Sequence, residues 1–455
     1  MVYNQNAFQT YLDTHREQFL DELRQIIAFP SVAAQKRGIH ECADWVVARL
    51  KKIGASVQKF ELPNGGSPVI FGEIGAGERI LLVYNHYDVQ PEEPLEQWET
   101  SPFELTLRED TLFGRGVVDD KGELLARIQA IETWQATQGE LPIKIKFVFE
   151  GEEEIGSINL PAWAESNRTI LGADGLLWEG GGRDETGKNS MAEGCKGIAY
   201  FELRCKGAAY DQHSSIAPIV PNPAWRLVWA LSTMKNEHDE ITIDGYMEHV
   251  RQMPDWVIER IDNLPFESEK IRQRVGLEHW LNDMDDMTAL RRYMLEPTLT
   301  ICGFDSGYKG EGTKTVLPAE AMVKLDCRLV PNLTPHLAQD LIRNHLDARG
   351  FHDISLTLLG GEEPAMEPED SLVRRAAIAA CQDVFGHEPI ISPWFAGSGP
   401  MYPLSVMLGI PVISAGATWH PHARAHAPNE NIFVQDYFDA MHLTAALMGH
   451  FAAGQ

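Results

Sequence analysis

Acidic residues and histidines follow short apolar segments at several points along this chain of 455 residues. The apolar run 80–84 leads into His86. The segment 143–149, which is predicted to be a strand, leads into the three glutamates at 152–154, and a short predicted strand at 175–178 leads into Glu179. Unbroken apolar runs of this length indicate strands buried on both faces of a sheet. Because such sheets build their sites at the carboxyl ends of the strands, we expect these polar groups to meet.

Helix signals lie between these strands, so the sequence predicts an α/β fold, a mixed sheet flanked by helices. Pro30 and Gly54 mark the ends of the first two predicted helices. The predicted helices are residues 5–28, 39–53, 123–137 and 371–385, with a further strand at 411–414.

The hydrophobic pattern changes near Gly197. Apolar and polar residues alternate at 198–205 and again at 320–329, as in a sheet with one covered face. A helix is expected at 222–236, another ends before Gly350, and a last strand is expected at 353–359. This part of the chain therefore predicts a separate α+β domain.

The two patterns together predict a catalytic domain that is split by an insertion. Its first part is expected at 1–196 and its second part at 361–455, with the inserted domain at 197–360. The segment 240–300 is rich in Trp, Met and charged residues, and its pattern assigns no elements.

Composition excludes several classes of partner. The chain has 39 Lys and Arg, 66 Asp and Glu, and a formal net charge of −27. No basic excess offsets phosphate charge, so neither nucleic acid nor a membrane surface is expected as a partner. No apolar run could span a membrane, and the first residues lack a secretory signal pattern. Six scattered cysteines without a CxxC pair indicate free thiols and a cytoplasmic location.

The polar clusters contain the ligand types of a catalytic metal. Imidazole nitrogen and carboxylate oxygen, without cysteine, suit catalytic zinc or a related divalent ion. Asp88 follows His86 by two residues and can accept a hydrogen bond from its second ring nitrogen.

Each of these motifs also has an ordinary interpretation. Asp119 and Asp120 can cap the helix that follows them. Some of the glutamates at 152–154 can be solvated surface residues, and spacing does not say which are functional. His420 and His422 can belong to a surface loop. Glu430 can orient His426 or cap the next segment.

Five motifs in order resemble the co-catalytic di-zinc exopeptidase family, which includes aminoacylases, glutamate carboxypeptidases, desuccinylases, carnosinases and cytosolic non-specific dipeptidases. The motifs are HYDVQP at 86–91, GRGVVDDKG at 114–122, EGEEEIGS at 150–157, WEGGG at 178–182 and HAPNENI at 426–432. Four further segments resemble the carnosinase and cytosolic dipeptidase branch: DQHSS at 211–215, KTVLP at 314–318, RLVPN at 328–332 and AGSGP at 396–400.

The resemblance implies two divalent metal ions per subunit, zinc first, with manganese or cobalt as alternatives. It assigns His86 and Glu179 to one ion, and Glu154 and His426 to the other. Asp119 would bridge them, and the Asp119–Asp120 peptide would be cis. Asp174 and Glu179 are five residues apart where several relatives have six, so Asp184 is the substitute candidate.

The resemblance also implies the remaining roles. Glu153 would be the general base, and Asp88 would orient His86. The inserted domain would be a lid that forms a homodimer, and His213 would reach the partner's site to stabilise the oxyanion. The implied substrate-binding residues are Arg328, which would hold the substrate carboxylate, and Thr315, Gly397 and Ser398.

The expected function is metal-dependent hydrolysis of dipeptides or short peptides that have a free C-terminal carboxylate. An N-acyl-amino-acid amidohydrolase would share the same metal site and differ only in the pocket for the acyl side. A non-catalytic metal-binding dimer is the alternative from another class, and a missing base or bridging ligand would favour it. Glu153 and Asp119 are both present.

Overall fold

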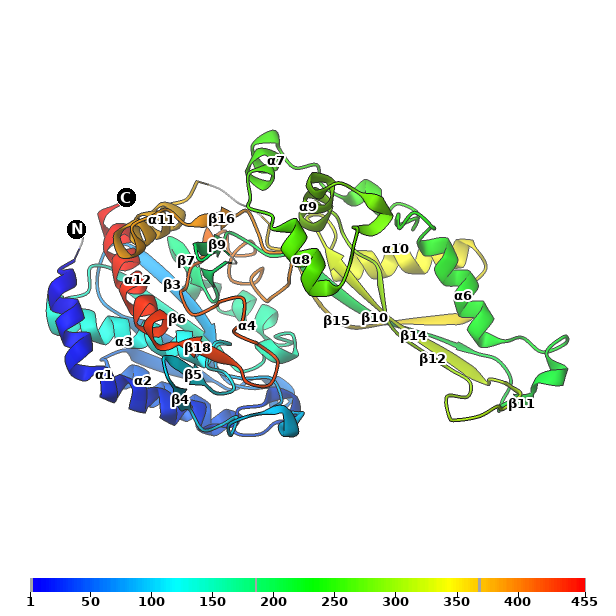
Figure 1. Cartoon of the computed structure of the whole chain (residues 1–455), viewed down its shortest axis with the longest axis horizontal. Coiled ribbons are helices and arrows are strands. Elements are labelled where there is room, and N and C mark those ends of the chain that lie inside the picture. Colours follow the sequence, from blue (N-terminus) through cyan, green and yellow to red (C-terminus); the bar gives the residue numbers. More distant parts are fainter. Residues whose placement is uncertain (1–2, 185, 367–369, 455) are drawn as a thin grey trace. The chain divides into compact units, whose positions relative to one another are not determined.

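The computed structural model of the protein describes residues 3–184, 186–366 and 370–454 (Figure 1). The chain forms two compact units. The first unit comprises residues 1–194, 367–394 and 400–455, and the second comprises residues 195–366 and 395–399. The second unit therefore interrupts the first, and a short later segment of the chain returns to it.

A mixed sheet lies at the centre of the first unit. Its order is β1-β2-β6-β3-β7-β17-β9-β16, and β8 pairs with β9. Strands β3, β6, β7 and β17 run parallel to their neighbours within this set, whereas β1 and β2 are antiparallel. The strands are β1 Ser56–Phe60, β2 Val69–Ile74, β3 Ile80–His86, β6 Lys144–Glu150, β7 Gly175–Trp178, β8 Gly182–Arg183, β9 Asn189–Ala192, β16 Ile390–Ser392 and β17 Val412–Ser414.

Helices pack around this sheet, which confirms the predicted α/β class with flanking helices (Figure 1). They are α1 Gln5–Ile27, α2 Ile39–Lys52, α3 Lys121–Gln138, α4 Leu160–Ser166, α5 Arg168–Leu171, α11 Leu372–Phe385 and α12 Val434–Ala453. A small sheet of β4 Thr106–Arg108, β5 Thr111–Phe113 and β18 Asn431–Phe433 completes the unit. Apolar side chains of the sheet and of α1, α2, α3, α11 and α12 form one continuous core.

The central strands bring their carboxyl ends to one edge of the sheet. Strand β3 pairs in parallel with β6 on one side and β7 on the other. A buried guanidinium fixes this edge, because Arg127 of α3 donates to Tyr84 O at 2.9 Å and Trp178 O at 2.6 Å. It thereby joins the last residues of β3 and β7, just before the two expected ligands His86 and Glu179.

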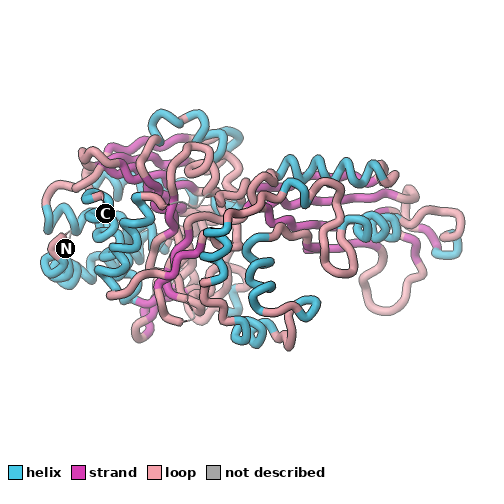
Figure 2. Tube along the Cα trace, turned by 90° about the horizontal axis from the view of Figure 1, so that it is seen from above, coloured by secondary structure: helices cyan, strands magenta, loops and turns pink. Residues whose placement is uncertain are grey.

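The second unit contains a four-stranded antiparallel sheet in the order β12-β14-β10-β15. Its strands are β10 Gly197–Lys206, β12 Thr300–Ser306, β14 Glu320–Leu329 and β15 Ile354–Glu362, and β11 Gln212–His213 pairs separately with β13 Val316–Leu317. Helices α6 Pro223–Met234 and α10 Pro335–Ala348 contact this sheet (Figure 2). The segment that the sequence left unassigned forms the short helices α7 Asp255–Asp262, α8 Ser268–Val275 and α9 Asp286–Leu295.

The predicted alternation divides this sheet into a covered face and an open face. On β14 the side chains of Ala321, Val323 and Leu325 are buried, whereas the residues between them are half-buried. Strand β10 has the same pattern. We call the face formed by the half-buried residues the open face. No helix in the described ranges is long and apolar enough to span a membrane.

Candidate metal centre

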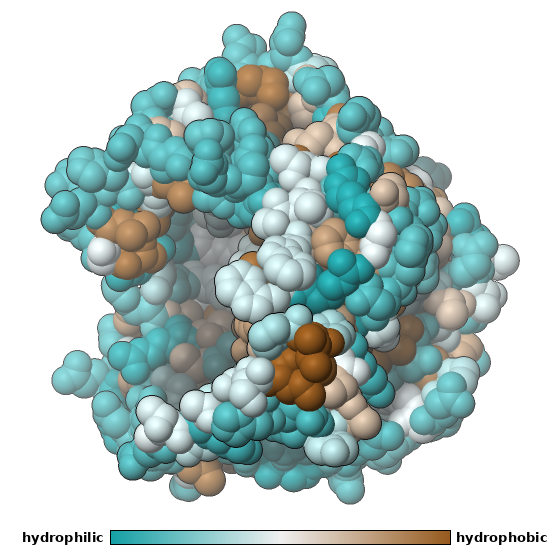
Figure 3. All heavy atoms as spheres, turned by 90° about the vertical axis from the view of Figure 1, so that its right-hand side faces the viewer, coloured by the Kyte–Doolittle hydropathy of each residue, from teal (hydrophilic) through white to brown (hydrophobic). Residues whose placement is uncertain are grey.

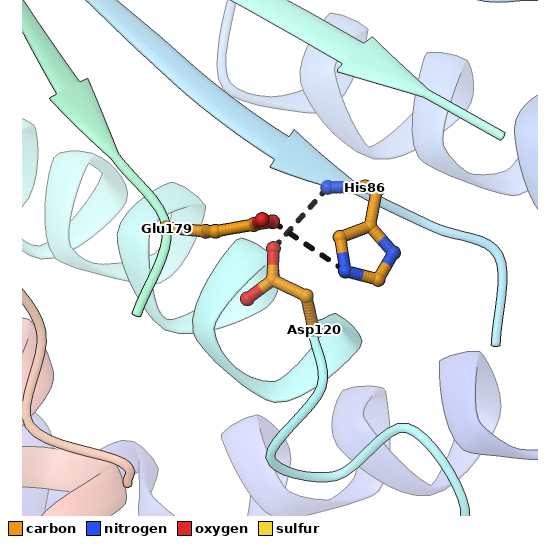
Figure 4. A group of neighbouring side chains, drawn as sticks. All are labelled: His86, Asp120 and Glu179. Atoms are coloured by element: carbon orange, nitrogen blue, oxygen red, sulfur yellow. Dashed lines mark hydrogen bonds and ion pairs between the residues drawn. The ribbon is translucent and has the colours of Figure 1, made fainter. Parts of the chain in front are cut away.

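His86 at the end of β3 begins the first of two clusters of ligand-type side chains. Its Nε2 lies 3.0 Å from Asp119 Oδ1 and 3.4 Å from Glu179 Oε2. His86 is fully buried, and Glu179 follows β7 on the neighbouring strand (Figure 4). Nitrogen and oxygen donors thus converge at the predicted edge of the sheet.

His426 forms the second cluster with the same aspartate. Its Nε2 lies 2.9 Å from Asp119 Oδ2 and 3.2 Å from Glu154 Oε2. One carboxylate therefore places one oxygen beside each histidine, which is the arrangement of a ligand shared by two ions. The backbone of His426 has a φ of 61°, a left-handed conformation that non-glycine residues adopt mainly where the surroundings enforce it.

Asp120 also lies within the first group by distance, together with His86 and Glu179 (Figure 4). Its Oδ2 already accepts hydrogen bonds from Asn85 Nδ2 at 2.7 Å and from His86 N at 3.2 Å, whereas its buried Oδ1 has no hydrogen-bond partner among the described residues. The side chain does not cap α3. Asp119 remains the carboxylate with an oxygen near each histidine, and the Asp119–Asp120 peptide is cis.

Asp88 contacts residues of both clusters. His86 Nδ1 lies 3.1 Å from the Asp88 carbonyl oxygen and 3.4 Å from its Oδ1. The Asp88 carboxylate accepts from Glu153 N at 3.3 Å and Glu154 N at 3.1 Å. This buried residue thus holds both the imidazole and the turn Glu153–Ile155 in place.

The three consecutive glutamates have three different surroundings. Glu152 accepts hydrogen bonds from Ser67 N and from Asn159, so it fixes the segments that contain these two residues. Glu154 faces His426 and accepts from Gln90. The Glu153 carboxylate has no hydrogen-bond donor among the described residues, and the charges of His86, Glu154 and Asp119 act on it. The sequence could not separate these glutamates because all three follow the same strand.

Glu179 rather than Asp184 lies with His86. Asp184 accepts from Thr186 N and Lys188 N within its own turn. Within the described part of the chain, the buried Glu179 Oε2 has no hydrogen-bond partner. Such an atom costs free energy unless a ligand compensates for it. The donor set at this position therefore fits a bound cation.

The site concentrates negative charge in a buried space. Burial and neighbouring carboxylates raise the pKa of Glu153, Glu154 and Glu179 above the usual glutamate range. Burial opposes protonation of His86, but Glu179 and Asp119 outweigh it and raise its pKa. These carboxylates repel one another, and divalent cations are the natural counter-charge for such a cluster.

A missed feature of the site is the role of Glu430. Its buried carboxylate accepts from Gly116 N at 2.9 Å, Val118 N at 2.9 Å and Asp119 N at 3.1 Å. Arg115 Nη1 donates to the same group at 2.8 Å. Glu430 therefore shapes the loop that presents Asp119, a role outside both interpretations that the sequence suggested.

The other expected site residues belong to the second unit. Arg328 Nη1 donates to Ser398 Oγ at 2.9 Å, and its Nε lies 3.6 Å from Asp326. Exposed His213 lies 2.9 Å from Ser215 Oγ and 3.4 Å from Thr315 Oγ1. The carbonyl oxygen of Gly397 accepts from Lys196 N at 3.0 Å. The structure thus brings Arg328 to Ser398 and His213 to Thr315.

Comparison with known proteins adds independent findings. The model described as Peptidase family M20/M25/M40 matches residues 82–450. The Cys-Gly metallodipeptidase dug1 of Schizosaccharomyces pombe is 30% identical, covering 74% of this chain and 74% of that protein. The Beta-Ala-His dipeptidase of Rattus norvegicus is 28% identical, covering 83% and 82%. The solved M20 family metallo-carboxypeptidase Sso-CP2 from Sulfolobus solfataricus has a TM-score of 0.90 at 35% identity, covering 96% and 99%.

Replacing Glu430 should weaken metal binding although its carboxylate binds the loop before Asp119 and not a histidine. In Glu430→Gln the amide nitrogen meets backbone donors, so the loop before Asp119 loses its fixed shape. We expect zinc affinity to fall roughly 10- to 100-fold, as measured by competition with a chelator. Glu99→Gln, at an exposed ion pair with Arg108, is the control. Unchanged affinity in Glu430→Gln would contradict this role.

Proposed function

The chain belongs to Peptidase family M20/M25/M40, and on this premise we propose that it is a dipeptidase. It hydrolyses the amide bond of dipeptides or short peptides with a free C-terminal carboxylate, in a metal-dependent reaction. The observation that carries the proposal is the pair of histidine and carboxylate clusters that share Asp119. Relatives named Cys-Gly and Beta-Ala-His dipeptidases support the substrate class.

We propose zinc as the ion in both clusters, with manganese or cobalt as alternatives. His86 and Glu179 would hold one ion, Glu154 and His426 the other, and Asp119 both. Imidazole and carboxylate donors suit these metals. When bound, a divalent pair lowers the pKa of a water molecule and polarises the scissile carbonyl.

Glu153 is the proposed general base. Its carboxyl is near His86, Asp119 and Glu154, whose charges all act on its pKa. Its backbone nitrogen donates to Asp88, and no described residue donates a hydrogen bond to its carboxylate. It would take a proton from the attacking water and give it to the leaving amine nitrogen.

The second unit supplies the proposed substrate contacts. Arg328 carries a planar fork of donors that suits a carboxylate, and Ser398 already holds one of its nitrogens. With Thr315 and Gly397, these residues would select short substrates by their C-terminal end. His213 would donate to the developing oxyanion in the site of a second copy.

No disulfide bond forms among the described residues, and five of the six cysteines are buried. This supports the proposal that the protein works in a reducing compartment such as the cytoplasm.

A substrate panel separates the dipeptidase from the N-acyl-amino-acid amidohydrolase. We expect zinc- or manganese-loaded protein to cleave free dipeptides, and a chelator to abolish this activity. N-acetyl and N-succinyl amino acids should be cleaved poorly, as followed by release of the free amino acid. Cleavage of the N-acyl substrates alone would keep the metal site and overturn the dipeptidase assignment.

Removing the proposed base should separate metal binding from turnover. In Glu153→Gln we expect unchanged metal content by mass spectrometry and a fall in kcat of roughly 10²- to 10⁴-fold. The matched control is Glu152→Gln, which loses loop hydrogen bonds and should lower the melting temperature while retaining turnover. Substantial turnover by metal-loaded Glu153→Gln would contradict the assignment.

We also propose that the protein is a homodimer through its second unit. Trp225 and Trp229 of α6 are 57% and 55% exposed and stack on each other. Ile301 and Phe304 are exposed on β12, which lies at an edge of its sheet. Figure 3 shows hydrophobic residues, in brown, exposed among hydrophilic ones on a face of the molecule. Exposed apolar side chains beside an unpaired strand edge favour association of two copies.

Complementation tests the dimer and the role of His213 together. His213→Ala and Glu153→Gln should each be nearly inactive alone. After mixing and subunit exchange, half of the dimers contain one variant of each kind, and one of their two sites is intact. We therefore expect about a quarter of wild-type activity to return. Failure to recover activity in mixed dimers confirmed by mass would show that His213 does not act across subunits.

A further inference from the structure

The open face of the second unit's sheet carries two opposite charges on either side of β10. Arg328 of β14 and Glu362 of β15 both pair in register with Ile198. Residues opposite each other on adjacent strands share a face, so both side chains stand on the open face. Two strand spacings separate their backbones by about 10 Å.

The neighbours of Arg328 already have partners within the protein. Arg328 bonds Ser398 and approaches Asp326. The buried Lys196 ammonium donates to Tyr293 O at 2.7 Å and Glu296 O at 2.6 Å, at the end of α9. Arg328 and Lys196 are therefore both held by protein groups.

Glu362 differs from these neighbours. Among the described residues, no side chain or backbone donor binds its carboxylate, and no basic nitrogen lies within ion-pair distance of it. Burial raises the pKa of Glu362 to about 7, although Arg328 acts in the opposite direction. A half-buried carboxylate without a partner is costly, and a cationic ligand group would offset that cost.

An amino acid held by its carboxylate at Arg328 extends its side chain from the same Cα. A lysine or arginine side chain is long and ends in hydrogen-bond donors, so it can reach across β10 towards Glu362. A short or apolar side chain would leave Glu362 without a partner.

We propose that Glu362 binds the basic side chain of the substrate's C-terminal residue and makes the enzyme selective for dipeptides that end in lysine or arginine. This inference rests on the proposed dipeptidase function and on Arg328 as the carboxylate ligand. Glu362 would contribute to substrate affinity and not to the chemical step, so its effect should appear in KM.

Glycyl-lysine and glycyl-norleucine test the proposal, because their side chains have the same length up to the ammonium group. We expect metal-loaded wild-type protein to favour glycyl-lysine about tenfold in kcat/KM. Glu362→Gln should lose this preference through a higher KM for glycyl-lysine, with glycyl-norleucine unchanged. Glu362→Gln removes a charge that has no partner, so the melting temperature should not fall.

Glu202→Gln is the matched control, because Glu202 lies on the same open face and is already paired with Arg204. This variant should keep the preference for glycyl-lysine. An equal preference in wild type and Glu362→Gln would overturn the proposal. So would an equal rise of KM for both peptides, which would indicate contact with the N-terminal ammonium.

Calorimetric binding of L-lysine and L-norleucine keeps this test separate from the test of catalysis. Tighter binding of L-lysine by wild type, lost in Glu362→Gln, would support the site even if no dipeptide were cleaved. Equal binding of the two amino acids by wild type would overturn it. Absence of hydrolysis alone would count against the dipeptidase function and not against Glu362.

Discussion

The structure of the first unit depends on one constraint, the repulsion between buried carboxylates. Asp119, Glu153, Glu154 and Glu179 lie at one edge of its sheet, where burial weakens the screening of their charges. Their backbones are therefore fixed by groups that do not compete for their oxygens. Arg127 donates to carbonyl oxygens at the ends of two strands and does not bind the carboxylate oxygens of the proposed ligands.

The same principle appears in the acceptors behind the site. Asp88 receives the backbone nitrogens of Glu153 and Glu154, and Glu430 receives three nitrogens of the loop before Asp119. Each is an anion that orders a backbone turn and, through it, a proposed ligand. The cluster thus consists of an inner group of carboxylates close to the two histidines and an outer group, Asp88 and Glu430, whose carboxylates accept from backbone nitrogens.

Much of this arrangement could be predicted from the sequence, because strand periodicity and position are local properties. The apolar runs before His86 and Glu179 identified strands whose ends meet, and the family resemblance is confirmed by the match over residues 82–450. The alternation at 320–329 identified a sheet with one covered face. Helix bounds differ by only a few residues from the predicted ranges.

What the sequence could not show depends on contacts between distant segments. Arg127 follows Glu123 by four residues and resembles a surface ion pair of a helix, yet both side chains are buried. The three nitrogens bound by Glu430 lie far from it in the sequence. The proposed role of Glu362 likewise depends on the strand register, which places it across β10 from Arg328.

The insertion also affects how the protein is made. Strand β7, which directly precedes Glu179, pairs with β17, and the chain between them includes the entire second unit. His426 and Glu430 follow later still, close to the C-terminal helix α12. Such non-local pairing slows folding, because distant segments must meet before either is stabilised. During synthesis, the candidate site around Asp119 therefore stays incomplete until the segment that contains His426 and Glu430 has left the ribosome.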